Sequence, residues 1–521
     1  MIHKLIVRYR VMVTAALICC CSSTESLRQR VNETLIHGTV ASGFEPVRDA
    51  FIDNFVKRGE IGAAVCAYYK GENVVDLWGG YREPHRKLPW EEHTMIIVFS
   101  TTKGMTATAV AKAVSSGILD YDEKVSRYWP EFAQNGKSDI TVRQLLNHEA
   151  GLPAFDRPMS YRQMRNLDSL AVILAAQKPF WKPGTRHGYH SSTLGMYANE
   201  LIRQADPQHR SLGIFFQQEI AQPLGVDFFI GLPDSVPDER LAKVKLFSPP
   251  LAMFKMPWKQ TRGMLNPHSL FFRAMMLPKD AKPNSRDYLR IEQGSGNGIG
   301  EVRALAKVYG NLALGGQELG ITTEVFDQLC NGSSPLDGQE DILLRIPSWY
   351  NLGFLKPGDP CEFGTSSHCF GTPGLGFAYA MVKMEYKMIN DPRERALRDA
   401  VYACINALGE DETGHALGKW SQNGVTDTEP ECQSSYRECM SKRMPPLQGI
   451  MIIPEGPYPV RTVRPSRSIL LDEVKEIPNC STECRESAIR RIAASVKANA
   501  PASITVPSES RCRPDAVSTY S

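Results

Sequence analysis

The sequence lacks a strong excess of charge of either sign. Its 521 residues include 60 Lys and Arg against 57 Asp and Glu, a formal net charge of +3. A balance this close creates no field that attracts nucleic acid or an anionic membrane, so we expect a small-molecule or peptide-like partner instead. The hydrophobic share of 42% is that of a globular protein with a large core, and the length allows two to four domain-sized units.

The sequence also lacks several common site motifs. No pair of His or Cys residues has metal-ligand spacing with supporting structure, so we expect neither a metal nor another cofactor. The Gly-rich segment 294–298 is not followed by Lys-Ser/Thr and therefore does not predict a phosphate loop. Its Gly294-Ser295-Gly296 triplet lacks the Gly-x-Ser-x-Gly spacing of a nucleophile elbow, which argues against an α/β-hydrolase.

No apolar run near the N-terminus reaches the roughly 20 residues of a transmembrane helix. Lys4, Arg8 and Arg10 precede an apolar stretch over residues 11–21, and polar residues follow it at once. This pattern is typical of a signal peptide, which we place at residues 1–24. The mature chain would then have no transmembrane span; the alternatives are a buried N-terminal helix or a short membrane anchor.

The cysteines and the glycosylation sequons also favour entry into the secretory pathway. Three of the 13 Cys lie at residues 19–21, so cleavage after them would leave ten, an even number compatible with disulfide bonds. Asn32, Asn331 and Asn479 each begin an Asn-x-Ser/Thr sequon. We therefore predict a secreted, or secretory-pathway luminal, glycoprotein with disulfide bonds, and membrane anchoring by the N-terminal segment as the alternative.

Periodicity along the chain predicts a mixed α+β domain over residues 44–408. We expect a first helix near residues 44–52, a tight hairpin of strands 62–69 and 73–78, and a strand 95–99 entering a helix 101–116. A mainly helical subdomain follows over about 140–300, with expected helices that include 142–146, 167–177 and 215–220. Beyond it we expect a helix 301–314, strands 352–355 and 376–384 returning to the sheet, and a closing helix 395–408 packed with the first on that sheet. No internal repeat is found.

Composition changes after residue 409. Cys432, Cys439, Cys480, Cys484 and Cys512 are scattered among Pro, Ser, Arg and Glu, with few helical patterns. We interpret residues 409–521 as a Cys-containing C-terminal tail outside the catalytic unit, either disulfide-linked or disordered.

Ser100 and Lys103 form the main candidate for chemistry. Three residues apart at the start of a helix, they share a face, so the amine can approach the hydroxyl. A Lys activates a Ser only if its ammonium is destabilised, and the positive end of a helix contributes to that while its free N–H groups can hold an oxyanion. The alternative is an N-capping Ser beside a solvated Lys.

The surrounding segments favour the reactive pair. The stretches 99–103, 117–132, 140–152 (ending Leu-Leu-Asn-His-Glu-Ala-Gly-Leu), 181–184 with Tyr189, 297–300 and 370–374 closely resemble the serine β-lactamase-like family. That family includes class C β-lactamases, penicillin-binding DD-peptidases and related esterases. The resemblance covers roughly residues 44–408 and implies an antiparallel sheet flanked by helices, an inserted helical subdomain, and a site in the cleft between them.

The resemblance also implies roles for individual residues. Ser100 is the expected nucleophile, Lys103 its proton acceptor, and Tyr189 of Tyr189-His190-Ser191 the second proton-transfer group, with Ser191 in the substrate site. Tyr197 of Tyr197-Ala198-Asn199 is a rival for the Tyr role, and a core or surface Tyr is the bland alternative for both.

The third family motif departs from its pattern. Where the family has Lys-Thr-Gly or His-x-Gly, this chain has Thr372-Pro373-Gly374. Thr372 hydrogen-bonds but carries no charge, which affects both carboxylate binding and the tuning of Lys103. The resemblance still implies that the Leu375 amide completes the oxyanion hole. His368 is a weaker candidate for the missing group, and a surface His is its simpler interpretation.

Three functions remain open at this point. The favoured one is a serine hydrolase that transfers an acyl group from an uncharged ester, amide or lactam through Ser100, Lys103 and Tyr189. The second is a catalytically weakened protein of the same fold, used for binding or scaffolding. The third is a protein in which the tail mediates assembly and the lactamase-like part presents it.

Overall fold

The structure is a computed structural model that describes residues 26–247, 256–275, 278, 280–331, 340–357, 373–385 and 391–408. These residues belong to one compact unit, Met1–Trp420. The predicted signal peptide, the tail 409–521, Thr372 and His368 lie outside the described residues.

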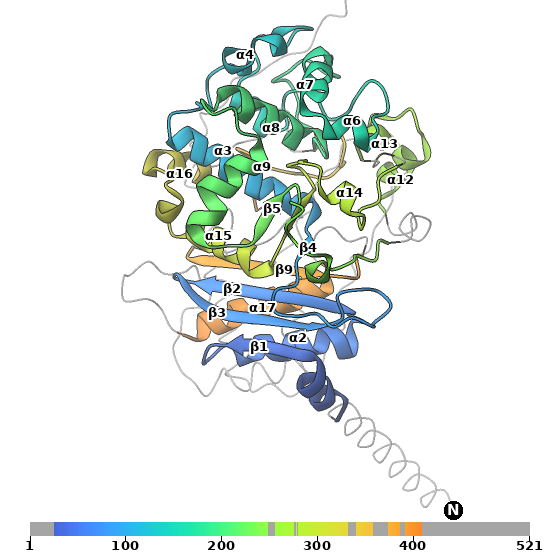
Figure 1. The fold of residues 1–521 in the computed structure, drawn as a ribbon, viewed down its shortest axis with the longest axis vertical. Helices are drawn as coiled ribbons and strands as arrows, with labels where there is room; N and C mark the ends of the chain where they lie inside the picture. The colour runs from blue at the N-terminus through green and yellow to red at the C-terminus, as the bar shows by residue number, and fades with distance from the viewer. Residues whose placement is uncertain are drawn as a thin grey trace, which may run out of the picture. The chain divides into compact units, whose positions relative to one another are not determined.

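A four-stranded antiparallel sheet with the order β1-β3-β2-β9 forms one part of the molecule (Figure 1). Its strands are β1 (Ile36–Val40), β2 (Gly62–Tyr69), β3 (Glu72–Gly80) and β9 (Leu375–Met381). Lys70 and Gly71 form the tight turn between β2 and β3, both with positive φ, as an antiparallel hairpin of this length requires. The predicted hairpin is confirmed.

Two helices cover one face of this sheet, as predicted. Val47 and Phe51 of α2 (Glu45–Lys57) and Leu397 and Val401 of α17 (Pro392–Ala407) are buried in one cluster with apolar side chains of β2 and β3. Alternation along β2 places every second residue on this face, so the first and last helices of the domain close over the same strand.

A buried charge network fixes the start of α17 against the sheet. Arg393 pairs with Asp391 at 2.9 Å and with Glu60 at 3.0 Å, and Tyr379 of β9 donates its hydroxyl to Glu60 at 2.7 Å. Burial raises the pKa of Glu60, and the positive charge of Arg393 opposes that rise. Arg393 therefore supplies the counter-charge for a buried carboxyl group at the point where the chain returns to the sheet.

Helix α15 (Val302–Ala313) lies on the opposite face of the sheet, and two glycines allow the close approach. A Cβ on Gly376 of β9 would lie 2.2 Å from the carbonyl oxygen of Ala306 and 2.2 Å from the backbone nitrogen of Gly310. The two glycines therefore allow α15 to pack directly on the start of β9, next to the third motif.

The mainly helical region lies beyond α15 (Figure 1). Its helices are α3 (Thr102–Ser115), α4 (Val125–Tyr128), α5 (Val142–Leu146), α6 (Tyr161–Arg165), α7 (Leu167–Ala176), α8 (Thr193–Ala205), α9 (Leu212–Phe216), α10 (Gln222–Leu224), α12 (Trp258–Leu265), α13 (Leu270–Met275), α14 (Arg286–Leu289) and α16 (Thr323–Cys330). Helix α9 continues into a π-helical turn, Gln217–Ala221, over the predicted helix 215–220. The fold is therefore α+β, with antiparallel sheets and an inserted helical region.

A second, three-stranded sheet interrupts that region. Strands β4 (Ile96–Ile97), β6 (Gly298–Gly300) and β5 (Phe228–Ile230) pair in the order β4-β6-β5. Gly298 and Gly300 fit because a Cβ at either position would clash with the ring of Phe228. Strands β5 and β6, with three residues each, were too short to predict from periodicity.

One strand prediction is wrong. Residues 352–355 do not return to the main sheet; β7 (Tyr350–Asn351) and β8 (Phe354–Leu355) form a separate two-stranded sheet. Leu352 and Gly353 form its turn, both with positive φ. Asn351 explains the arrangement, since its side-chain amide donates to three carbonyl groups, those of Gln328, Leu329 and Asn331, and ties β7 to the end of α16.

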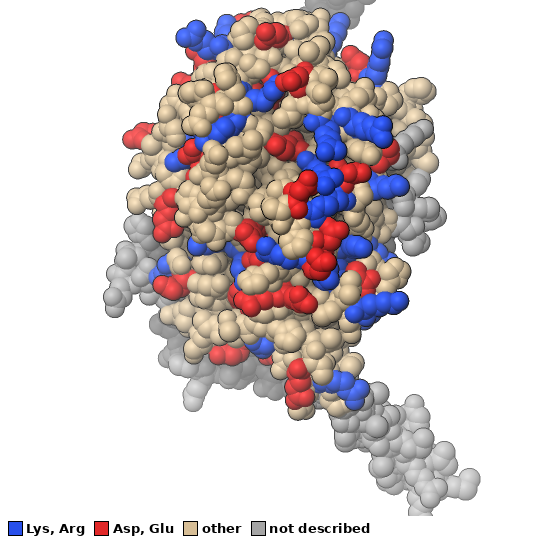
Figure 2. Space-filling view, in the orientation of Figure 1, with Lys and Arg blue, Asp and Glu red and all other residues tan. Residues whose placement is uncertain are grey.

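Positive and negative side chains are interspersed on the face shown in Figure 2. Among the described residues, no helix is both long and apolar enough to cross a membrane. Cys66 and Cys404 are buried and form no disulfide, so the disulfide prediction, which counted them among its ten cysteines, does not hold for these two.

Candidate active site

Ser100 lies in the turn that connects β4 to α3. The 3-10 turn Phe99–Thr101 precedes the helix, and Phe99 has a φ of +44°, an uncommon conformation for an aromatic residue. The Thr102 hydroxyl fixes the turn, because it donates to the Phe99 carbonyl at 2.5 Å and accepts from Gly298 N–H at 2.8 Å. Ser100 is thus exposed on a rigid turn at a helix N-terminus.

Lys103 lies below Ser100 and is only 5% exposed. Its Nζ is 3.4 Å from Ser100 Oγ and donates to the carbonyl oxygens of Ser191 at 2.6 Å and Ser295 at 2.9 Å. Burial lowers the pKa of Lys103 to about 7, because the ammonium loses its hydration and no carboxylate charge compensates for that loss. A substantial share of the amine is therefore neutral near neutral pH and can accept a proton.

Tyr189 completes the group of three. Its hydroxyl donates to Ser100 Oγ at 2.7 Å, and Lys103 Nζ lies 4.7 Å from the centre of its ring. Burial raises the pKa of Tyr189 to about 12, and the hydrogen bond with Ser100 opposes that rise. The phenol is therefore neutral in the resting site and acts as a hydrogen-bond donor to Ser100.

Asp341, which sequence reasoning missed, holds the backbone of Tyr189. One carboxylate oxygen accepts from Tyr189 N–H at 2.8 Å and from the Tyr350 hydroxyl at 3.1 Å. The other oxygen accepts from the N–H groups of Leu343 and Leu344, both at 2.8 Å. Four donors converge on a fully buried carboxylate, and it fixes two aromatic residues whose rings stack 6.2 Å apart.

Two buried histidines lie next to Tyr189: His148, whose ring centre is 5.2 Å from that of Tyr189, and the adjacent His190. His148 Nδ1 accepts from His190 N–H at 2.9 Å, and His190 Nε2 accepts from Leu152 N–H at 2.9 Å. Burial lowers the pKa of His190 to about 3 and holds that of His148 well below its ordinary value. Both rings are therefore neutral and serve as fixed hydrogen-bonding groups around Tyr189.

The rival Tyr197 does not reach the nucleophile. It lies in α8, is 1% exposed, and donates its hydroxyl to the Leu174 carbonyl at 3.2 Å. It packs edge to face on Phe132, which makes it a core residue. Of the two Tyr candidates, the structure brings Tyr189 to Ser100.

The third motif is described only from Pro373 onward, since Thr372 lies outside the described residues. Gly374 has a φ of +70°, donates to the Ala313 carbonyl at 3.1 Å and accepts from Lys70 N–H at 2.8 Å. Leu375 begins β9 and pairs with Tyr69. No described hydrogen bond joins Gly374 or Leu375 to Ser100, so the oxyanion role of Leu375 stays a prediction.

Ser191 and Ser295 contribute through their backbone. Ser191 is predicted to bind substrate, and that role stays a prediction; its carbonyl contact with Lys103, like that of Ser295, was not predicted. Ser295 is held in place because its hydroxyl accepts from Gly195 N–H at 2.6 Å. Within the described part of the chain, no group of three or more His, Cys, Asp or Glu side chains is arranged to hold a metal ion.

A buried Lys with a lowered pKa, an exposed Ser and a hydrogen-bond-donating Tyr therefore meet at one site, and comparisons with known proteins identify the family. The sequence model of the Beta-lactamase family matches residues 48–329. The Mycobacterium tuberculosis protein Esterase/beta-lactamase LipL is 30% identical over 347 residues, which are 66% of this chain and 78% of the relative. The chain therefore belongs to the β-lactamase-like serine hydrolase family.

Solved structures show the same fold. A family VIII carboxylesterase is 34% identical, with a TM-score of 0.62 over 71% of this chain and 99% of its own. A penicillin-binding protein homologue from Caulobacter crescentus is 33% identical, with a TM-score of 0.62 over the same shares. The antiparallel sheet and inserted helical region are thus those of the β-lactamase/transpeptidase fold.

Proposed function

We propose that this chain is a serine hydrolase that transfers the acyl group of an ester, amide or lactam to water through Ser100, Lys103 and Tyr189. The observation that carries the proposal is the convergence on Ser100 Oγ of the Tyr189 hydroxyl at 2.7 Å and the Lys103 amine at 3.4 Å. The family relationship supports the reaction class, since LipL and the family VIII relative are named as esterases.

In the proposed mechanism, neutral Lys103 accepts the Ser100 proton as Oγ attacks the carbonyl carbon. The oxyanion that forms is held by the backbone N–H groups of Ser100 and Leu375. Collapse breaks the bond to the leaving group, which receives the proton from Lys103 with Tyr189 as the relay. Water then attacks the acyl-enzyme by the reverse sequence, which releases the acid and regenerates the Ser100 hydroxyl.

The substrate class follows from the third motif. The sequence has the uncharged residue Thr372 where the family resemblance implies a Lys or His, so the proposed substrates are uncharged near the scissile bond. The same substitution supports the alternative, a catalytically weakened member used for binding or scaffolding. We also propose, from the N-terminal pattern and the sequons alone, that the chain enters the secretory pathway.

Hydrolysis of p-nitrophenyl butyrate by the full chain, with Ser100→Ala beside it, tests the proposal. Ser116→Ala is a matched control, because Ser116 lies at the other end of α3. We expect turnover by the native chain and by Ser116→Ala, and none above background by Ser100→Ala. A folded native chain that hydrolyses no ester, amide or lactam would favour the binding function, and turnover retained in Ser100→Ala would overturn the assigned nucleophile.

A further inference from the structure

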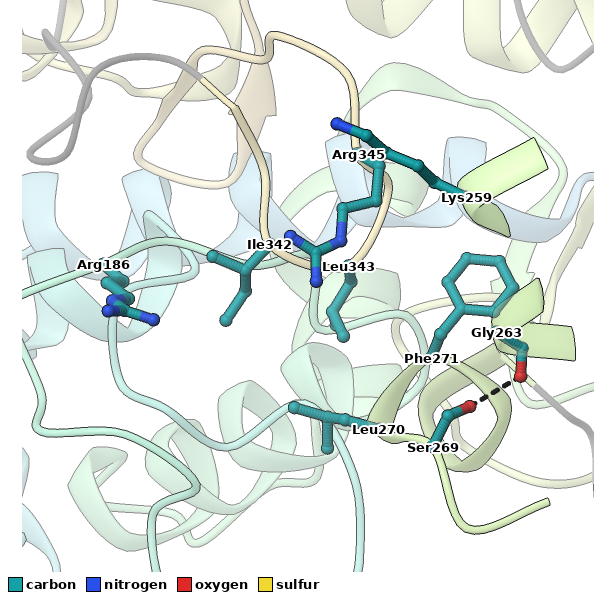
Figure 3. Close-up of a pocket in the computed structure, with 9 residues that line it drawn as sticks. All are labelled: Arg186, Lys259, Gly263, Ser269, Leu270, Phe271, Ile342, Leu343 and Arg345. Carbon is teal, nitrogen blue, oxygen red and sulfur yellow. Dashed lines mark hydrogen bonds between the residues drawn. The ribbon is translucent and has the colours of Figure 1, made fainter. Parts of the chain in front are cut away.

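A cavity of about 270 Å³ lies between α12, α13 and two loops, and it does not contain Ser100, Lys103 or Tyr189 (Figure 3). Its size is just below the usual range for small-ligand pockets, roughly 300–1,000 Å³. One loop carries Arg186, three residues before Tyr189, and the other carries residues 342–345, directly after Asp341.

Two kinds of side chain line the cavity. Leu270, Phe271, Ile342 and Leu343 form an apolar wall. Arg186 and Phe271 lie on opposite sides of the space in Figure 3, with Ile342 and Leu343 between them. A ligand that spans the cavity therefore meets a guanidinium group at one end and an aromatic ring at the other.

The charge of the lining is positive. Arg186, Lys259 and Arg345 contribute three cations, and Glu340 lies 3.4 Å from the Lys259 amine and 3.7 Å from the Arg345 guanidinium. Both distances exceed those of good charge-assisted hydrogen bonds, and no ion pair joins Arg186 to a described carboxylate. One loosely held carboxylate against three cations leaves a net positive site that favours an anion.

The lining is held in place by its backbone. Arg345 has a φ of +56°, and its N–H donates to the Asp341 carbonyl at 2.8 Å, which closes a tight turn. The Ile342 N–H donates to the His187 carbonyl at 3.3 Å and joins the two loops. A non-glycine residue is uncommon in this conformation, and such conformations concentrate at functional sites.

We propose that this cavity binds a small organic carboxylate with an apolar tail. The Arg186 guanidinium receives the carboxylate, the Arg345 guanidinium adds positive charge between the two ends of the cavity, and Phe271, Leu270 and Leu343 cover the tail. The site is separate from the nucleophile, and its occupation does not depend on the proposed hydrolysis. Because the same two loops hold Tyr189 through Asp341, an occupant would also brace the loops that position the candidate active site.

Isothermal titration of the full chain carrying Ser100→Ala tests the proposal with octanoate as the probe. We expect octanoate to bind at one saturable site. Octanamide, which lacks the charge, and butyrate, which lacks most of the apolar tail, should each bind with an affinity at least roughly tenfold lower. Arg186→Gln and Arg345→Gln should each weaken octanoate roughly tenfold. Arg127→Gln is the matched control, since Arg127 is an exposed arginine on α4 outside the cavity.

Other results would overturn the site. Octanoate affinity unchanged in the Arg186→Gln, Arg345→Gln double variant would place the ligand elsewhere, including at the candidate active site. Equal affinity for octanoate and octanamide would show that the cavity does not recognise the carboxylate charge. Absence of saturable octanoate binding would show that the proposed site does not exist. Each outcome is read from binding alone, so it is distinguishable from a failure of ester hydrolysis.

Discussion

The Tyr189 hydroxyl donates to Ser100 Oγ at 2.7 Å from a ring that lies 4.7 Å from the Lys103 amine. The two residues are 89 positions apart, and the turn before α3 on one side and the loop before α8 on the other bring them together. This contact places a proton donor, an exposed hydroxyl and a buried amine within one network.

Removal of the phenol hydroxyl should reduce turnover while leaving the fold intact. Tyr189→Phe keeps the ring that packs against His148 and Tyr350 and deletes only the donor to Ser100. We expect kcat to fall by about 10²–10³, the usual scale for a proton-transfer group. Tyr197→Phe, which deletes a hydroxyl that donates to Leu174, should cost about 1 kcal/mol of stability and leave kcat unchanged. Equal kcat in Tyr189→Phe and the native chain would contradict the role.

The pH dependence should follow Lys103. Since its pKa is lowered to about 7, the ammonium predominates below pH 7 and the proton-accepting amine above it. Therefore kcat/KM for a neutral ester should rise as pH increases through about 7 and then level off. Lys103→Arg retains a cation that does not deprotonate and should lower kcat/KM by about 10²–10⁴. Lys112→Arg makes the same change in the same helix and should leave kcat/KM unchanged. An unaltered pH dependence of kcat/KM in Lys103→Arg would exclude Lys103 as the base.

Asp341 should act as a positioning residue. Asp341→Asn places an amide among four hydrogen-bond donors, so at least one buried donor loses its partner, which costs about 1–3 kcal/mol. We expect lower thermal stability together with a fall in kcat that exceeds the change in KM, because Tyr189 moves relative to Ser100. Asp280→Asn, at an exposed position, is the control. A stability loss with native kcat in the folded fraction would limit Asp341 to a structural role.

Sequence reasoning found the residues that share a local pattern and missed those that meet only in the fold. Ser100, Lys103 and Tyr189 lie in recognisable segments, whereas Asp341 reaches Tyr189 from 152 positions away. The Ser295 carbonyl, 192 positions from Lys103, has no side-chain signal at all because every residue carries a carbonyl group. Contacts of this kind depend on tertiary packing, which periodicity does not encode.

Length and local pattern also separate the helices and strands that were predicted correctly from the strand that was not. The hairpin of β2 and β3 was predictable because two largely apolar runs flank the tight turn at Lys70-Gly71, and α2 and α17 were predictable because helical spacing marks them over 13 and 16 residues. The misplaced strand at 352–355 is short, and the Asn351 side chain decides where it pairs. A four-residue apolar run does not specify which sheet it joins.

Reinstating a charge in the third motif should broaden the substrate range. Thr372→His should raise kcat/KM for esters that carry a carboxylate near the scissile bond, because a protonated His offers the charge that Thr does not. Thr372→Ser keeps a hydroxyl and should leave rates near those of the native chain. Identical kinetics in Thr372→His and the native chain would contradict the account of this motif.

The central claim is that Ser100 is a nucleophile activated by Lys103. It is tested most directly by treating the native full chain with a fluorophosphonate and mapping the adduct by mass spectrometry on the tryptic peptide that ends at Lys103. The account predicts modification at Ser100, absent in Ser100→Ala and strongly slowed in Lys103→Arg. A folded protein without an adduct at Ser100, or equal labelling of the Ser100→Ala variant, would contradict it.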